Sequence, residues 1–161
     1  MSEHVLYDKL IGLLGEHSAT YRVIEHEPEG ATEAVSALRG NTLAQAAKCI
    51  VVMVKVTKKS KRYVLAVVPG NRRVDLGAVK ALFDGVYAGF ATPEVAERLA
   101  GSVSGTILPF SFDPELELVV DPALLEHEEL YFNAARLDRS LALRTADYES
   151  IAQPRRAPIS Q

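Results

Sequence analysis

Two runs rich in β-branched residues constrain the fold of this chain more than any other feature of its sequence. The runs are CIVVMVKVT at residues 49–57 and YVLAVVP at residues 63–69, and the basic segment KKSKR lies between them. β-Branched side chains favour extended backbone, and a polar segment between two such runs is typical of a turn. The pattern predicts two neighbouring buried strands joined by a solvated turn. A phosphate contact is the alternative interpretation of the basic segment.

Glycines mark the ends of several predicted helices. Apolar residues at helical spacing predict a first helix that ends near Gly15. Helical patterns followed by glycine also predict helices at 31–40, 74–85 and 92–101, and a final helix is predicted at 145–152. Thr32 is the candidate N-cap of the second helix, and Thr92 is that of the fourth, with Pro93 at its first position.

Further strands are predicted between these helices. They lie at 21–26, 115–121, 129–134 and 140–144. Strands that are partly in hairpins and partly separated by helices predict an α/β class with a mixed β-sheet flanked by helices. Periodicity leaves the closure of that sheet open. A chain of 161 residues can bury a core of its own, so residues 1–161 are predicted to form a single domain.

The charge balance limits the partners that this chain can bind. Its 18 Lys and Arg residues face 21 Asp and Glu residues, which gives a formal charge of −3. Such a balance excludes a generally basic nucleic-acid binder, so any RNA contact has to be local. Residues 1–17 lack a signal-peptide core, and no apolar run approaches the roughly 20 residues of a membrane span. We therefore expect a cytoplasmic protein with no membrane partner.

Several kinds of catalytic site have no support in the sequence. The histidines are scattered, and no pair has the i, i+4 spacing of metal ligands on a helix; they are His4, His17, His26 and His127. Neither a Gly-x-Ser-x-Gly motif nor a P-loop occurs. Cys49 lies in an apolar run and is interpreted as a small buried hydrophobe. The sequence thus predicts neither a metal nor a cofactor.

A lysine and a glycine-containing loop are the remaining candidates for chemistry. The Lys48 ammonium either extends past its own methylenes to solvent or is held in a pocket that uses its charge. In GSVSGTILPF, Gly101 and Gly105 allow backbone N–H groups to face one point and bind a developing oxyanion. The alternative is a helix cap followed by a turn. Pro109 stiffens the loop in either case, and an ammonium beside such donors suits ester hydrolysis.

Four separated segments resemble one known family. They are HEPEGATEAVSALRG at 26–40, AAKCIVV at 46–52, GSVSGTILPFSFDPELELVVDP at 101–122 and YFNAARLDRSLALRTADYESIAQP at 131–154. Together they resemble the YbaK/prolyl-tRNA-synthetase-associated family of trans-editing deacylases, over about residues 5–155. Within that family the chain is most similar to the YeaK-type branch, which is also called ProXp-ST.

The resemblance implies a mixed, barrel-like β-sheet surrounded by helices, and the hydrolysis of wrongly charged aminoacyl-tRNA. The family lysine that opens the corresponding strand maps to Lys48, which would position the phosphate or carbonyl end of the substrate. The family loop G-x-x-x-G-G-x-x-P maps to Gly101, Gly105 and Pro109. The second glycine of the pair is Thr106 here, a substitution that retains the backbone N–H.

The YeaK-type branch also implies the choice of substrate. Seryl- and threonyl-tRNA are the implied substrates, with alanyl-tRNA as a further candidate. Other editing branches have a histidine, or a serine followed by glycines, where this chain has Asn133 and Ala134, so their amino-acid choice is not carried over. The candidate substrate-binding residues are Thr32, Thr106, Pro109, Asn133, Asp138 and Ser140, and Asp138 is alternatively a turn residue. We expect changes at Asn133 or Ser140 to affect Ser- and Thr-tRNA more than Ala-tRNA.

No general base stands out near Lys48 and the loop. The implied mechanism is attack of water on the ester carbonyl, with loop amides holding the oxyanion and the free ribose hydroxyl of the terminal adenosine orienting or deprotonating the water. The implied partners are the acceptor end of aminoacyl-tRNA and, as a further candidate, a synthetase. Two alternatives remain open. One is a module that binds aminoacyl-tRNA or a synthetase without hydrolysis, which Thr106 favours, and the other is a hydrolase of small esters or amides.

Overall fold

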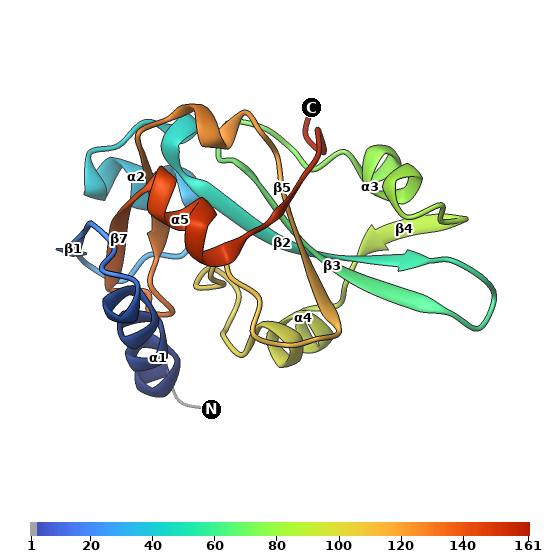
Figure 1. Ribbon diagram of the computed structural model, residues 1–161, viewed down its shortest axis with the longest axis horizontal. Coiled ribbons are helices and arrows are strands. Elements are labelled where there is room, and N and C mark those ends of the chain that lie inside the picture. Colours follow the sequence, from blue (N-terminus) through green and yellow to red (C-terminus); the bar gives the residue numbers. More distant parts are fainter. Residues whose placement is uncertain (1–2) are drawn as a thin grey trace.

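Eight strands in two sheets form the centre of the structure, a computed structural model that describes residues 3–161 (Figure 1). The larger sheet has the order β4-β2-β3-β5-β8, with bounds Tyr87–Phe90, Ala47–Lys55, Lys61–Pro69, Leu116–Val120 and Arg155–Arg156. The smaller sheet has the order β1-β7-β6, with bounds Tyr21–Glu25, Arg139–Arg144 and Glu129–Asn133. β5 pairs in parallel with β3 and β8, and the other pairs are antiparallel. The predicted mixed α/β fold is confirmed.

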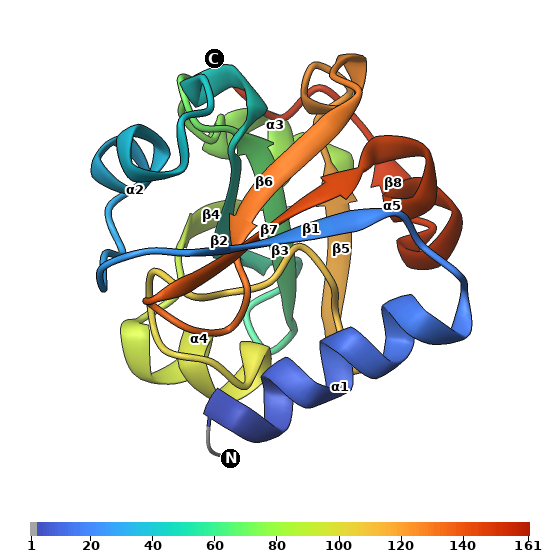
Figure 2. The same ribbon diagram turned by 90° about the vertical axis from the view of Figure 1, so that its left-hand side faces the viewer.

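The strands pack as two sheets instead of closing into one barrel. Figure 2 shows β1, β7 and β6 crossing in front of β2, β3 and β5. An isolated bridge between Ala46 and Tyr131 links the two sheets. One buried cluster joins Leu65 of the larger sheet to Phe132 and Leu141 of the smaller sheet. The barrel-like sheet that the resemblance implied is therefore realised as two packed sheets that share this core.

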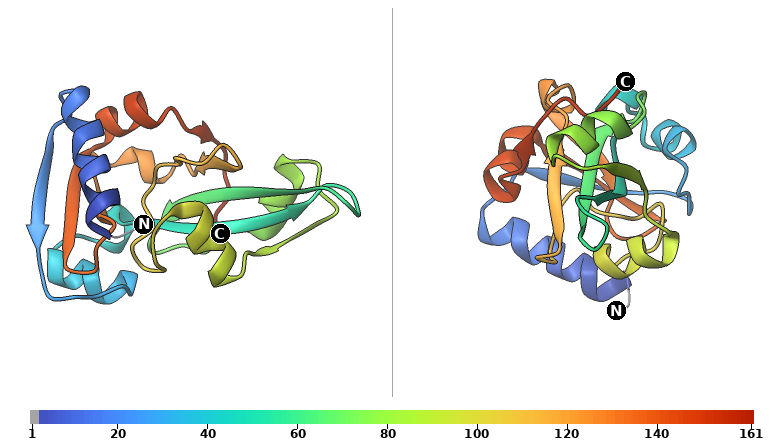
Figure 3. Two further views of the ribbon diagram at one scale, coloured as in Figure 1. Left: turned by 90° about the horizontal axis from the view of Figure 1, so that it is seen from below. Right: turned by 90° about the vertical axis from the view of Figure 1, so that its right-hand side faces the viewer.

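β2 and β3 form the predicted hairpin. Its register runs from Ala47 opposite Pro69 to Lys55 opposite Lys61. Side chains alternate between two cores, because Val51 belongs to the cluster between the sheets while Val52 belongs to the cluster beneath the third helix. Burial on both faces explains why the runs are continuously apolar. Figure 3 shows the basic tip of the hairpin projecting beyond the rest of the molecule.

Five α-helices of the described part of the chain cover these sheets. They are α1 Glu3–Glu16, α2 Thr32–Arg39, α3 Leu76–Leu82, α4 Pro93–Ala100 and α5 Thr145–Ala152. Thr92 caps α4 as predicted, because its side chain accepts the N–H of Val95 at 3.3 Å. Gly40 ends α2 in a left-handed conformation, also as predicted. Within residues 3–161, no helix has the length and apolar character that crossing a membrane requires.

Two local predictions were wrong, and two short strands were missed. Thr32 is not the N-cap of α2, because the helix begins at Thr32 and Ala31 occupies the cap position without a side-chain hydrogen bond. α3 is shorter than its pattern, since the Asp75 side chain caps it by accepting the N–H of Ala78. The strands β4 and β8 were not predicted. β4 has the sequence YAGF and β8 has only two residues, so neither offers a β-branched run.

Candidate active site

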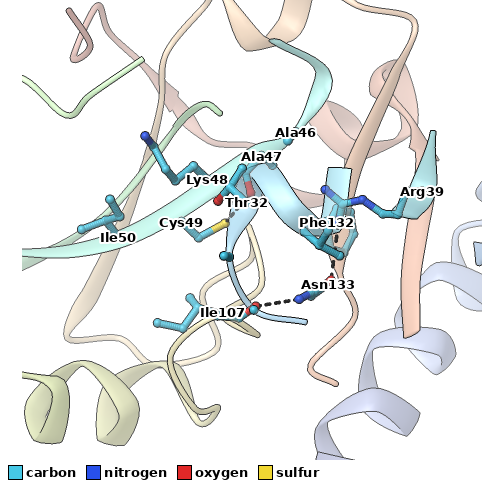
Figure 4. A pocket seen from close by; sticks show the side chains of 14 residues that line it. Thr32, Arg39, Ala46, Ala47, Lys48, Cys49, Ile50, Ile107, Phe132 and Asn133 are labelled. Carbon is cyan, nitrogen blue, oxygen red and sulfur yellow. Dashed lines mark hydrogen bonds between the residues drawn. The ribbon is translucent and has the colours of Figure 1, made fainter. Parts of the chain in front are cut away.

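A cavity of about 300 Å³ opens where α2, the start of β2, the end of β6 and the loop after α4 meet (Figure 4). Of the residues singled out from the sequence as site residues, Lys48, Gly105, Thr32 and Asn133 line it. Most of the other lining side chains are apolar, and among them are Val35, Ala46, Cys49, Ile50, Ile107 and Phe132. The structure therefore brings together residues from four segments that the sequence leaves far apart.

The open edge of β2 forms one wall of this cavity. β4 pairs with β2 only over residues 52–55, and the N–H of Ala91 then donates to the carbonyl of Val51 at 3.0 Å. Backbone groups of a strand point to alternate edges, so the N–H and C=O of Cys49 face the same edge as those of Val51. β4 has ended by this point. The edge of β2 at Cys49 is thus turned toward the cavity that this residue lines.

The Lys48 ammonium lies at the rim of the cavity. Its Nζ donates a hydrogen bond to the backbone carbonyl of Arg72, and the side chain points away from Asn133 in Figure 4. Partial burial, and then the charge of Arg73, lower the pKa of Lys48. Within residues 3–161 the ion pairs of the protein do not include Lys48. The side chain therefore extends past its methylenes and also keeps a charge that an anion can use.

Gly105 is the loop residue that reaches the cavity. Its φ of 90° lies in the left-handed region, and a Cβ at this position would lie 2.9 Å from the Cα of Gly30. Only glycine allows the two backbone segments to approach so closely. Its carbonyl accepts a hydrogen bond from Asn133, whereas its N–H has no partner among the described residues. This N–H is a free donor beside the cavity.

The other three loop residues lie outside the cavity. Gly101 ends α4 with a φ of 73°, and its N–H donates to the carbonyl of Glu97. Thr106 is fully buried, and its N–H and hydroxyl both donate to the carbonyl of Val103. The carbonyl of Pro109 accepts the hydroxyl of Tyr148 at 2.7 Å. The helix-cap alternative thus describes Gly101, while Thr106 and Pro109 anchor the loop to the protein interior.

The Asn133 side chain links two backbone segments beside the cavity by hydrogen bonds. Its Nδ2 donates to the carbonyls of Glu29 and Gly105 at 2.9 and 2.8 Å. Its Oδ1 accepts the hydroxyl of Ser140 at 2.8 Å. Ser140 is fully buried behind Asn133 and also lies 2.7 Å from Nε2 of His26. Asn133 therefore fixes the two backbone segments that approach each other at Gly105, and Ser140 orients Asn133 without lining the cavity.

Asp138 lies in the turn between β6 and β7 and does not line the cavity. Its carboxylate accepts from the guanidinium of Arg136 at 2.9 Å, and this interaction lowers the pKa of Asp138. Its backbone carbonyl accepts the N–H of His26 at 3.0 Å. The structure gives Asp138 the role of the turn residue, which was the alternative interpretation.

Arg39 is a site residue that the sequence did not single out. It lines the cavity from the end of α2, and Figure 4 shows it directed toward Asn133. Its side chain contacts neutral groups, with Nε donating to Asn41 at 2.9 Å and Nη1 donating to Ser140 at 3.2 Å. Burial lowers the pKa of Arg39 to about 10. Its position before Gly40 is that of an ordinary basic residue at a helix C-terminus, which conceals it in the sequence.

The lining offers no conventional general base. Among the described residues it contains no Asp, Glu or His side chain. The Cys49 thiol is present, but burial raises its pKa, so the nucleophilic thiolate is disfavoured. No group of three or more His, Cys, Asp and Glu side chains in residues 3–161 gathers as a metal site requires. The cavity is an apolar chamber with a rim cation, a half-buried guanidinium and a free backbone donor.

The model of the family described as "Aminoacyl-tRNA editing domain" matches residues 26–151. The chain belongs to this family. The relative "Multifunctional Ser/Thr-tRNA deacylase ProXp-y" of Escherichia coli (strain K12) is 44% identical over 151 residues, covering 93% of this chain and 90% of the relative. The resemblance stated from the sequence motifs is thereby confirmed.

Solved structures support the fold. The structure of "hypothetical protein APE2540" superposes with a TM-score of 0.84 at 21% identity, covering 95% of this chain and 99% of the other. A proposed trans-editing enzyme for prolyl tRNA synthetase superposes with a TM-score of 0.79 at 21% identity, covering 97% of both chains. At this level of identity the similarity concerns the fold alone.

Proposed function

We propose that this protein is a trans-editing hydrolase that deacylates seryl- and threonyl-tRNA, with alanyl-tRNA as a further substrate. The observation that carries the proposal is the cavity itself, in which the free N–H of Gly105 and the Lys48 ammonium flank an apolar chamber that has no acid or imidazole in its lining. Such a site can bind an ester and stabilise an oxyanion. The Ser/Thr-tRNA deacylase that is 44% identical supports the substrate class.

The reaction is the hydrolysis of the ester between the amino acid and the terminal ribose. Water adds to the carbonyl carbon, the oxyanion accepts the Gly105 N–H, and the bond to the ribose oxygen breaks as that oxygen takes a proton. Because the lining of the described cavity supplies no base, the neighbouring free hydroxyl of the ribose orients or deprotonates the water. One positioned oxyanion donor contributes about 10² to 10³ in rate.

The cations of the site have separate roles in this proposal. Lys48 at the rim binds the phosphate end of the substrate, because an ammonium without a carboxylate partner is a phosphate ligand. Arg39 lies inside the cavity with its guanidinium against Asn133 and Ser140. Its charge excludes amino acids with cationic side chains and favours those that bear a hydroxyl. Thr32 at the start of α2 adds a hydroxyl to the lining of the cavity.

Two further parts of the proposal concern partners and place. The acceptor end of aminoacyl-tRNA is the substrate-bearing partner, and a synthetase is a second partner that would supply mischarged tRNA. Translation supplies this substrate in the cytoplasm, where we place the activity.

A non-catalytic binding module is the second candidate function. The observation that favours it is the N–H of Thr106, which donates to Val103 and so removes one loop donor.

A deacylation panel tests the proposal. Purified protein is incubated with tRNAs charged with Ser, Thr, Ala, Cys and Pro, and the remaining aminoacyl-tRNA is measured over time. We expect rapid loss of Ser- and Thr-tRNA and slow loss of Pro-tRNA. Binding of all five without hydrolysis would establish the binding module instead. Hydrolysis of a serine ester of a simple alcohol at the same rate as Ser-tRNA would establish a general esterase.

A further inference from the structure

A second cavity adjoins the candidate active site on the far side of Lys48. It has a volume of about 440 Å³ and shares Lys48 and Ile50 with the first cavity. Arg73, Leu76 and Phe90 complete its main walls. None of the sequence motifs pointed to it, because its residues come from β2, β4, the segment before α3, the start of α3 and Gln161. A ligand that occupies the first cavity and extends past Lys48 enters this second one.

Phe90 is unusually exposed for an aromatic side chain. It is 60% exposed at the end of the edge strand β4. It lies directly opposite Val52 in the antiparallel pairing, and opposite residues of a pair share one face of the sheet. Lys48 and Ile50 lie on that face too, because side chains alternate along β2. Phe90 and Lys48 are therefore separated by about four residues of strand, or roughly 13 Å.

Two cationic side chains, Lys48 and Arg73, line the other end of this cavity. The charge of Arg73 is one cause of the lowered pKa of Lys48, so the two groups are close enough to repel one another. In the described part of the chain, the Arg73 side chain has no hydrogen bond or ion pair. Asp75 also lines the cavity, and its carboxylate accepts the N–H of Ala78 to cap α3. An anion between Lys48 and Arg73 would remove their repulsion.

We propose that this second cavity binds the 3′-terminal nucleotides of tRNA, with a base stacked on Phe90 and a phosphate held by Lys48 and Arg73. An exposed aromatic ring in the same cavity as cations that form no ion pair within the described residues is a combination by which proteins bind single-stranded RNA. This subsite rests on the proposed function, since the aminoacyl group of the same tRNA would occupy the first cavity. It adds Phe90 and Arg73 as binding residues that the deacylation chemistry does not require.

Binding of uncharged RNA tests this subsite separately from catalysis. The probe is a short fluorescent RNA that ends in CCA, and binding is followed by anisotropy. We expect Phe90→Ala to weaken binding about 5- to 150-fold and Phe90→Trp to retain it, because a stacking contribution of this size depends only on the ring. Arg73→Ala should weaken binding and reduce the slope of log affinity against log salt by roughly 0.7, the value for one phosphate contact of a single strand.

The matched control is Tyr87→Ala. Tyr87 is an aromatic residue on the same strand, is 53% exposed and lies outside the second cavity. Equal weakening by Tyr87→Ala and Phe90→Ala would overturn the subsite, as would unchanged binding of Phe90→Ala. A dimer in solution that dissociates in Phe90→Ala would also overturn it and assign the ring to a second copy of the chain.

The two proposals fail in different ways. If the wild-type protein binds the CCA probe through Phe90 but releases no amino acid from Ser-tRNA, the subsite holds and the hydrolytic function is wrong. If the wild-type protein deacylates Ser-tRNA and Phe90→Ala does so with unchanged KM, the function holds and the subsite is wrong. For an active enzyme we expect Phe90→Ala to raise KM while kcat changes little, since the ring is far from the ester.

Discussion

Replacing Asn133 with alanine tests whether this residue supports the cavity or selects the substrate. The substitution removes a long hydrogen bond from Nη1 of Arg39 at 3.5 Å and three shorter ones, to the carbonyls of Glu29 and Gly105 and to the hydroxyl of Ser140. Each contributes about 0.5–1.5 kcal/mol net, so we expect the free energy of unfolding to fall by about 2–4 kcal/mol. For a chain of this length the melting temperature should fall by roughly 4–16 °C.

The expected effect on activity follows from the same contacts. Because both amide hydrogens of Asn133 are engaged by backbone carbonyls, the side chain has no free donor with which to recognise a substrate hydroxyl. Asn133→Ala should therefore slow deacylation of Ser-, Thr- and Ala-tRNA by similar factors, through displacement of Gly105. This replaces the sequence-based expectation that losses on Ser- and Thr-tRNA would be larger.

The assay combines thermal unfolding with single-turnover deacylation at a temperature where the variant is folded. Asn71→Ala is the control, because Asn71 is exposed and its side chain makes no hydrogen bond within the described residues. It should change stability by less than about 0.5 kcal/mol. A stable Asn133→Ala protein that loses activity on Ser- and Thr-tRNA alone would refute this reasoning and return Asn133 to substrate recognition.

Three further predictions address other parts of the site. Lys48→Ala should reduce deacylation by orders of magnitude with little change in melting temperature, and full activity of a folded variant would reduce Lys48 to a surface residue. Gly105→Ala should abolish turnover through its contact with Gly30, whereas Gly101→Ala, with open space around its Cβ, should cost about 1–2 kcal/mol of stability and leave the single-turnover rate unchanged. Equal rates for the two would remove the oxyanion role. Lys58→Ala with Lys59→Ala should lower the salt slope of tRNA binding by up to about 1.8 if the hairpin tip contacts stem phosphates, and an unchanged slope would leave the tip as a solvated turn.

The hairpin was predictable because its pattern is local and strong. Residues of β2 and β3 are buried on two faces, so the composition of each run reports its environment directly. β4 escaped prediction because Tyr87–Phe90 is short, contains a glycine and lies at the edge of the sheet, where exposed positions place few demands on residue type. Its existence depends on pairing with β2, which is a tertiary interaction that no local pattern encodes.

The site was only partly predictable for a related reason. Lys48 and the loop were found, but spacing treats Gly101 and Gly105 as equivalent. In the fold one glycine ends α4 and the other lies against Gly30, and this difference arises from how the segments pack. Arg39 was missed because its residue type is common at a helix end. The roles of Asn133 and Ser140 depend on hydrogen bonds between segments about a hundred residues apart.

The short strand β4 also explains why a cavity exists at this place in the sheet. An edge strand with unpaired backbone groups invites association with other chains, and proteins usually cover such an edge. Here β4 covers β2 only from Val52 onward, and α2 and the loop at Gly105 close over the remainder without pairing to it. The backbone of Cys49 is left facing an enclosed space, beside Lys48 and a free loop amide. A longer β4 would pair with this segment and fill the cavity, but the chain turns into α4 at this point, because Thr92 caps that helix and Pro93, which has no N–H to donate to β2, is its first residue.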